Sequence, residues 1–323
     1  MLSTHKVEVV VVTLESHSNA DSLSIVRPFG YSVCVRTEDW QNGQLGAYLP
    51  PDSLVNTERP EFVFLHKDKK WERIKAKKLR GVQSFGLLVH APEGSIIGDD
   101  VASVLEVQHY EPPEPMSTGG EVEKVPPHLY VSKYDVDSMR RYPTIFYPGE
   151  MVMITEKIHG ASSRFCWIDD RIYCGSRSEW KRESDDNLWW KTIKKEPSIV
   201  AFCKSNPGFI LYGEVYGIQD LRYGLQPNTL AFAAFDIRRN DHSFVNAEES
   251  RQLCEKFNVP CVPLISICEF NLEKIYQLAE GQSLVSNANH VREGCVVKPL
   301  QERYNDEIGR VQLKIVGLGY LEK

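Results

Sequence analysis

The stretch Thr-Glu-Lys-Ile-His-Gly-Ala-Ser (155–162) places Lys157 three residues before Gly160. A lysine amine can attack the α-phosphate of a nucleotide when it is neutral, and nearby positive charge or burial favours the neutral form by lowering its pKa. Glycine lets the backbone turn tightly beside a nucleotide. A Lys-x-x-Gly spacing is nonetheless expected about once by chance in a chain of this size. The rest of the sequence must therefore decide whether Lys157 is a nucleophile.

Composition bounds the class of protein. The chain has 323 residues, of which 42% are hydrophobic and 25% are charged, as in soluble globular proteins. This length favours two domains, each able to bury its own core. No apolar run reaches the roughly 20 residues that span a bilayer, and the N-terminal residues lack the pattern of a secretory signal. We therefore expect no membrane association.

The eight cysteines contain no Cys-x-x-Cys pair, so a zinc site of closely spaced thiolates is not predicted. Free thiols are typical of reducing compartments, which predicts an intracellular protein of the cytoplasm or nucleus. Cys254, Cys261 and Cys268 lie seven residues apart across a predicted helix and an apolar strand. We expect them to be small buried residues.

The net charge of −6 argues against a protein held to nucleic acid by bulk charge, but basic residues cluster at 67–81. From Glu72 onward, Ile74 and Ala76 alternate with basic residues, which predicts a strand with one basic face. Such a face is either an edge strand protected by lysine or a surface that follows phosphates. The candidate RNA-binding residues are Arg73, Lys75, Lys77, Lys78 and Arg80.

Turn residues divide the chain into three parts. Residues 1–108 hold short alternating runs separated by Gly, Pro, Asn and Asp, which suits a small β-barrel. Residues 109–128 are rich in Pro, Glu and Gly and form a predicted linker. Residues 129–323 mix strands and helices. The predicted strands are 151–155, 163–168, 171–175, 209–216, 229–237, 295–298 and 311–316; the helices are 197–204, 247–257 after an Asn246 cap, and 272–280 after Asn271.

Two segments of the first part, HSNADSLSIVR (17–27) and KLRGVQSFGLL (78–88), resemble the signatures of the tRNA-binding oligonucleotide-binding (OB) barrel. The resemblance covers about the first 90 residues, and Ser18 replaces the usual proline. Such barrels bind single strands through a charged groove and stacking aromatics. The resemblance implies RNA binding without implying specificity for tRNA.

Downstream of Lys157 come, in order, GSRSEW (175–180), LYGEVYG (211–217), FAAFDI (232–237), REGCVVKP (292–299) and VQLKIV (311–316). Together they resemble the nucleotidyltransferase motifs of covalent polynucleotide ligases and capping enzymes. With a barrel in front, the chain is most similar to ATP-dependent RNA ligases of the Deinococcus and Naegleria type. The implied fold class is a two-domain α+β chain. An N-terminal OB-fold barrel precedes a mixed α/β, ATP-grasp-like adenylation domain of antiparallel sheets and helices.

The resemblance implies a role for each motif residue. Lys157 would carry AMP, Phe235 would stack on adenine, and Arg177 would contact ribose or phosphate. Lys298 and Lys314 would hold the α-phosphate. The other implied nucleotide ligands are Glu156, Gly160 and Glu214, and the implied metal-binding residues are Glu214, Asp236 and Glu293, with ATP and Mg²⁺ or Mn²⁺ as cofactors.

Three residues depart from the family pattern. His159 stands where many relatives have aspartate, which puts a metal–water role there in doubt. Ser162 stands where DNA ligases usually carry arginine, which favours RNA ligases. Gln312 replaces the first lysine of a Lys-x-Lys pair, so Lys314 is expected to act alone.

The order of the domains separates the alternatives. DNA ligases and capping guanylyltransferases place a barrel after the transferase domain, whereas nine residues follow Lys314 here. A non-catalytic RNA-binding adaptor would need decayed motifs, but these are present. We therefore expect a monomeric RNA ligase that joins 3′-hydroxyl and 5′-phosphate ends of nicked or broken duplex RNA.

Overall fold

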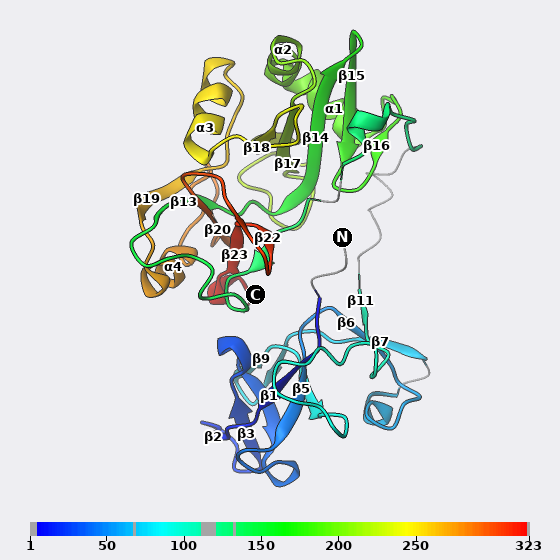
Figure 1. Cartoon of the computed structure of the whole chain (residues 1–323), viewed down its shortest axis with the longest axis vertical. Helices are drawn as coiled ribbons and strands as arrows, with labels where there is room; N and C mark the ends of the chain where they lie inside the picture. Colours follow the sequence, from blue (N-terminus) through cyan, green and yellow to red (C-terminus); the bar gives the residue numbers. More distant parts are fainter. Residues whose placement is uncertain (1–4, 67–68, 111–120, 132–133, 322–323) are drawn as a thin grey trace. The chain divides into compact units, whose positions relative to one another are not determined.

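The computed structural model describes residues 5–66, 69–110, 121–131 and 134–321, and the chain divides into two compact units between Pro113 and Glu114 (Figure 1). Residues 111–120 of the predicted linker and Lys67 of the basic cluster lie outside the described residues. Within the described ranges, no helix is both long and apolar enough to cross a membrane.

The N-terminal unit consists of small antiparallel sheets around two apolar clusters, in agreement with the predicted OB fold. One sheet has the order β1 (Glu8–Val11), β5 (Leu45–Leu49), β10 (Leu87–His90), and a second has β2 (Glu15–Ser16), β3 (Leu23–Val26), β4 (Val33–Arg36). A third has β11 (Gln108–His109), β6 (Ser53–Asn56), β7 (Trp71–Arg73), and β8 (Lys77–Leu79) forms a hairpin with β9 (Val82–Ser84). Three 3₁₀ turns, η1 (Pro28–Gly30), η2 (Thr37–Asp39) and η3 (Val63–Leu65), connect strands.

The two signature segments of this unit form one hydrogen-bonded structure. His17 Nε2 lies 3.2 Å from the carbonyl oxygen of Leu79, and Asn19 Nδ2 donates to the carbonyl of Arg80 at 3.0 Å. Gly81 follows with φ of +93°, a left-handed turn that glycine adopts without a steric cost. The first segment therefore fixes the basic hairpin β8–β9 through its backbone.

The single strand predicted from Glu72 onward is wrong. The structure forms β7 and β8 separately, because Ile74 turns into the core between them. The pairing register changes at that point: β7 pairs with β6, whereas β8 pairs only with β9 among the described strands.

The second unit contains two five-stranded sheets with helices on their outer faces (Figure 1). The first sheet has the order β12 (Asp137–Ser138), β23 (Leu313–Val316), β20 (Gly294–Pro299), β13 (Met151–Glu156), β19 (Leu264–Glu269). The second has β16 (Trp180–Lys181), β15 (Arg171–Ser176), β14 (Gly160–Ile168), β17 (Ile210–Tyr216), β18 (Ala231–Arg238). The remaining elements are hairpin β21 (Tyr304–Asn305)–β22 (Gly309–Arg310), turn η5 (Pro127–Leu129) and helices α1 (Leu188–Lys195), α2 (Pro197–Ser205), α3 (Ala247–Lys256), α4 (Leu272–Ala279) and α5 (Leu318–Leu321).

Each sheet buries its helix-covered face. Helices α1, α2 and α3 pack on the second sheet around Phe165, Phe202 and Ile237, and α4 packs on the first sheet around Ile154 and Val297. Strand β13 belongs to the first sheet and β14 to the second, so the short connection 157–159 joins the two sheets. The chain therefore brings Lys157 to the junction between them.

Helix capping differs from the prediction at one of two positions. Asn271 caps α4 by accepting a hydrogen bond from Lys274 N, as predicted. The predicted Asn246 cap of α3 is wrong, because its side-chain oxygen accepts from Glu302 N at 2.8 Å instead. Helix α1 was not predicted, although Asn187 caps it by accepting from two backbone amides.

Two further expectations change. Of the three cysteines spaced by seven, Cys254 is buried as predicted, but Cys261 and Cys268 are half-buried.

Residues 121–123, predicted as part of the linker, pair with β16, since Glu123 N donates to Trp180 O and Arg182 N donates to Glu121 O. The ladder of the second sheet thus continues into that segment.

Candidate active site

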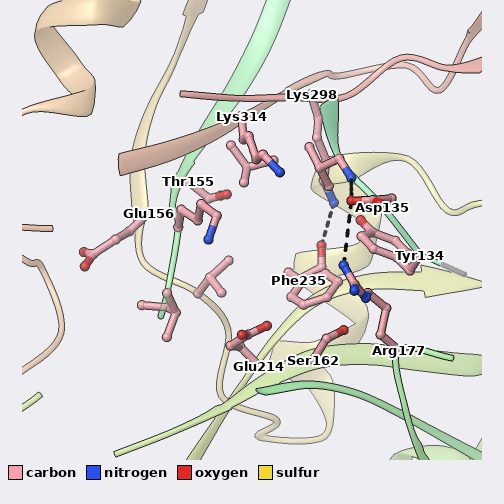
Figure 2. Close-up of a pocket in the computed structure, with 15 residues that line it drawn as sticks. Tyr134, Asp135, Thr155, Glu156, Ser162, Arg177, Glu214, Phe235, Lys298 and Lys314 are labelled. Atoms are coloured by element: carbon pink, nitrogen blue, oxygen red, sulfur yellow. Dashed lines mark hydrogen bonds and ion pairs between the residues drawn. The ribbon is translucent and has the colours of Figure 1, made fainter. Parts of the chain in front are cut away.

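A cavity opens between the two sheets of the second unit (Figure 2). It is lined by residues of both sheets and of the connection between them. Seven predicted nucleotide-site residues line it: Glu156, Lys157, Arg177, Glu214, Phe235, Lys298 and Lys314. Three predicted site residues do not line this cavity: Gly160, Asp236 and Glu293. Glu293 nevertheless accepts a hydrogen bond from Lys157, which does line it.

Lys157 forms an ion pair with a glutamate, although the positive charge of Lys314 also lies nearby. Its Nζ donates to Glu293 Oε1 at 2.7 Å. Burial lowers the pKa of Lys157, but the carboxylates of Glu293 and Glu214 raise it by more, so the net shift is upward. Burial alone does not produce the expected depression of the Lys157 pKa, because the nearby carboxylates outweigh it.

Glu214 and Glu293 supply carboxylate groups close to Lys157. Burial raises the pKa of Glu214 to about 8 against the opposing charge of Lys157. Glu293 Oε2 is buried and has no hydrogen-bond partner among the described residues, and His159 Nδ1 lies 3.8 Å away. An unpartnered carboxylate oxygen suits a divalent cation or a water bound to one. These two residues therefore fit the predicted metal role.

The oxygens of Asp236 are taken up by protein partners, which does not favour the predicted metal role. Its side chain is almost fully buried, with one oxygen accepting from Tyr134 Oη at 2.6 Å and lying 3.0 Å from Lys298 Nζ. The guanidinium of Arg310 donates to both oxygens. Glu302 binds the same guanidinium, so two carboxylates balance two cations. Asp236 is thus the centre of a buried ion network beside the cavity.

The predicted roles of Gly160 and Glu156 also change. Gly160 lies in β14, and a Cβ there would come within 2.3 Å of Val215 O, so the glycine permits close approach of β17 rather than a turn at the nucleotide. The carboxylate of Glu156 points away from the labelled lysines (Figure 2) and accepts from Ser283 Oγ and Leu284 N, both at 2.6 Å. That carboxylate anchors a loop instead of facing a nucleotide.

The two motif lysines differ in how they are held. Lys298 Nζ donates to Phe235 O at 2.7 Å (Figure 2). The same amine is paired with Asp236. Lys314 forms no ion pair with any described residue, and burial together with the charge of Lys157 lowers its pKa. Of the two motif lysines, Lys314 is therefore the one without an ion-pair partner among the described residues.

One wall of the cavity consists of residues 134–136, which were not predicted as part of the site. Tyr134 Oη bridges Asp236 and Gln312 Oε1, the latter at 2.8 Å, and its ring lies 5.1 Å from that of Phe235. Gln312 Nε2 in turn donates to Asp135 O. No motif marks this segment in the sequence, because only the parallel pairing of β12 with β23 brings it to the site.

Replacing Tyr134 with phenylalanine should remove the bridge while keeping the ring contacts. The lost hydroxyl leaves two acceptors less satisfied, so we expect a stability loss of about 1 kcal/mol in urea unfolding. Weaker nucleotide binding should accompany it, because the same segment lines the cavity. Tyr130→Phe is the matched control, since Tyr130 is 71% exposed. Identical unfolding curves for Tyr134→Phe and the parent would refute the bridging role.

Comparison with known proteins decides the family. The model of the family described as RNA ligase matches residues 150–316, a little over half of the chain. The chain belongs to the RNA ligase family. An OB-fold domain model matches residues 5–91, which agrees with the fold of the N-terminal unit. This confirms the expected enzyme class and fold. No curated protein matches the chain.

Solved structures extend the similarity beyond the matched family region. The chain is similar to an apo variant of the Naegleria gruberi RNA ligase, with a TM-score of 0.83, 24% identity and coverage of 99% of this chain and 98% of that one. A variant with AMP and Mn gives a TM-score of 0.83 at 24% identity, with 98% of each chain covered. The same ligase with PPi gives 0.82 at 24% identity, covering 99% of this chain and 98% of that one. This RNA ligase family member therefore shares its fold along nearly the whole chain.

Proposed function

We propose that this RNA ligase uses ATP to join a 3′-hydroxyl to a 5′-phosphate through a lysyl-AMP intermediate. The observation that carries the proposal is the convergence of Lys157, Lys298 and Lys314 with Phe235 on one cavity. A nucleophilic amine, cations for phosphate and an aromatic face for a base are the groups that adenylyl transfer needs.

In the first step, the neutral amine of Lys157 attacks the α-phosphorus of ATP. A phosphorus–nitrogen bond forms, the bond to the β-phosphate oxygen breaks, and pyrophosphate leaves while the amine loses its second proton. Lys314 and Lys298 would hold the α-phosphate oxygens, and Arg177 would contact ribose or phosphate. Phe235 would stack on adenine.

The later steps transfer AMP. The RNA 5′-phosphate takes AMP from Lys157, which restores the amine, and the 3′-hydroxyl then displaces AMP to form the phosphodiester. The basic hairpin β8–β9 supports RNA binding by the N-terminal unit, because Lys77, Lys78 and Arg80 are exposed and form no ion pair with described residues. Such unpaired cations follow a phosphate backbone.

Mg²⁺ or Mn²⁺ would be held by Glu214 and Glu293, and would supply positive charge that offsets the negative charge on the phosphates. The described residues contain no cluster of three metal-ligating side chains. A cation with one or two protein carboxylates and nucleotide phosphates as ligands fits that arrangement. The Naegleria gruberi complexes with ATP and Mn support the same cofactors.

The test is incubation of the protein with α-labelled ATP and, separately, α-labelled GTP. ATP with Mg²⁺ or Mn²⁺ should give a covalent adduct, and excess chelator should abolish it because the phosphate charge is no longer offset. GTP should give none. A GTP adduct would favour a capping-type guanylyltransferase, and the absence of any adduct in a folded protein would favour the RNA-binding adaptor. Sealing of DNA but not RNA ends would favour a DNA ligase.

A further inference from the structure

The sheet β11–β6–β7 of the N-terminal unit has a face that does not pack in the core. Side chains alternate along a strand, and residues paired across strands share a face. Val55 and Ile74 are buried in the core cluster of this unit. Trp71 and Arg73 alternate with Ile74 on β7, so both lie on the opposite, outward face.

Tyr110, which follows the edge strand β11, belongs to the same outward face at the opposite edge of the sheet from β7. Its backbone N donates to Asp52 O at 2.8 Å, which continues the pairing of β11 with β6. Arg73 lies 4.1 Å from the centre of the Tyr110 ring and pairs with Asp52 at 2.6 Å. The guanidinium is therefore held over the ring with its charge largely matched, which leaves Arg73 poorly placed to grip a phosphate.

The remaining residues of this face, Trp71 and Lys75, make few interactions that would stabilise the fold. Trp71 is half-buried and belongs to none of the apolar clusters formed by the described residues, and its indole N–H has no hydrogen-bond partner within them. By contrast, the indoles of Trp189 and Trp190 donate to backbone carbonyls. Lys75, two residues after Arg73, is exposed and forms no ion pair in the described part of the chain.

We propose that this aromatic–cation face, formed by Trp71, Arg73, Lys75 and Tyr110, binds single-stranded RNA. Bases would stack on Trp71 and on the face of Tyr110 that Arg73 does not cover, and Lys75 would contact phosphate. Aromatic rings beside unpaired cations are how proteins hold single strands without reading their sequence. A duplex, whose bases are already stacked, would gain little from the aromatics. The inference rests on the proposed RNA substrate and adds that an unpaired stretch is bound.

The experiment compares three fluorescent ligands in equilibrium binding to the full chain: a single-stranded RNA of about 12 nucleotides, within the usual site sizes, a strand of equal length with abasic positions, and a duplex. The single strand should bind about tenfold more tightly than the abasic strand, which carries the same phosphates. Trp71→Ala and Tyr110→Ala should each lose about tenfold for the single strand and nothing for the abasic strand. Trp71→Phe should retain most of the affinity.

Lys75→Ala should weaken both strands and reduce the salt dependence of binding, because it removes a phosphate contact. Tyr130→Ala, an exposed aromatic of the other unit, is the matched control and should change nothing. Equal affinity for the normal and abasic strands would overturn the proposal. It would also be overturned if the folded Trp71→Phe, Trp71→Ala and Tyr110→Ala variants all bound the single strand as tightly as the parent.

Adduct formation from labelled ATP needs no RNA and separates the two ideas. A normal adduct without base-dependent binding would refute the stacking face and leave the proposed ligase mechanism unaffected. Base-dependent binding without an adduct from ATP would leave the stacking face standing and defeat the proposed ligase mechanism.

Discussion

Lys157→Ala should abolish formation of the protein–AMP adduct and the sealing of RNA that carries a 5′-phosphate. The alanine side chain has no amine to attack ATP. Arginine should not rescue, because a guanidinium stays protonated and offers no neutral nucleophile. RNA that already carries AMP on its 5′-phosphate should still be sealed by Lys157→Ala, because that substrate bypasses the first step.

The measurement is label transfer from ATP, followed by sealing assays with both RNA substrates. Lys191→Ala on α1 is the control, since Lys191 is exposed and does not line the cavity. It should behave as the parent in every assay. A labelled adduct on a purified Lys157→Ala protein would show that another residue is the nucleophile.

Asp236→Ala should strongly destabilise the second unit. Asp236 is paired with Lys298 and Arg310, and all three side chains are at least nine-tenths buried. Removing one partner of a buried ion pair leaves uncompensated charge and typically costs about 3–5 kcal/mol. Glu302 can balance only one of the two cations. Chemical denaturation should therefore show a large shift of the midpoint.

Asp306→Ala is the matched control, because Asp306 is exposed on the β21–β22 hairpin that also carries Arg310. It should unfold like the parent. Asp236→Asn keeps the shape and some hydrogen bonds and should lose less stability than alanine. If Asp236→Ala unfolded at the parent midpoint, the ion network would not contribute to the fold.

The ion pairs of Asp236 also predict that the free energy of unfolding decreases at acidic pH. Burial alone would raise the pKa of Asp236, but Arg310 and Lys298 lower it to about 2. A carboxyl group whose pKa is lower in the folded state stabilises the protein above its unfolded pKa of about 3.9. That contribution should be lost as the pH falls from about 4 through 2. Asp236→Asn should lack this part of the acid transition.

The sequence predicted most of the residues that line the cavity and much of the local structure. Motif order identified Lys157, Glu214, Phe235, Lys298 and Lys314 as one set, because each motif carries a residue type that nucleotide transfer requires. Alternating apolar residues located seven of the twelve strands described in the second unit, since strand period is a local property. The missed strands are β12, β16, β19, β21 and β22, of which only β19 is longer than two residues.

Contacts between distant segments were decided only by the tertiary structure. The motif of Asp236 could not show that Arg310 and Tyr134, from segments 74 and 102 residues away, would take both its oxygens. Likewise, Gly160 is required by the approach of β17, which no local pattern encodes. A residue type can limit what a side chain does, but its partners depend on which strands pair.

The N-terminal unit shows the same division. Composition located a basic cluster at 67–81, and charge is readable from sequence alone. The folded structure decides which of these basic residues form ion pairs. Asp52 pairs with Arg73, whereas Lys75, Lys77 and Lys78 have no ion-pair partner among the described residues. Ion pairing depends on sheet register, and register follows from burying Val55 and Ile74 on one face of the sheet.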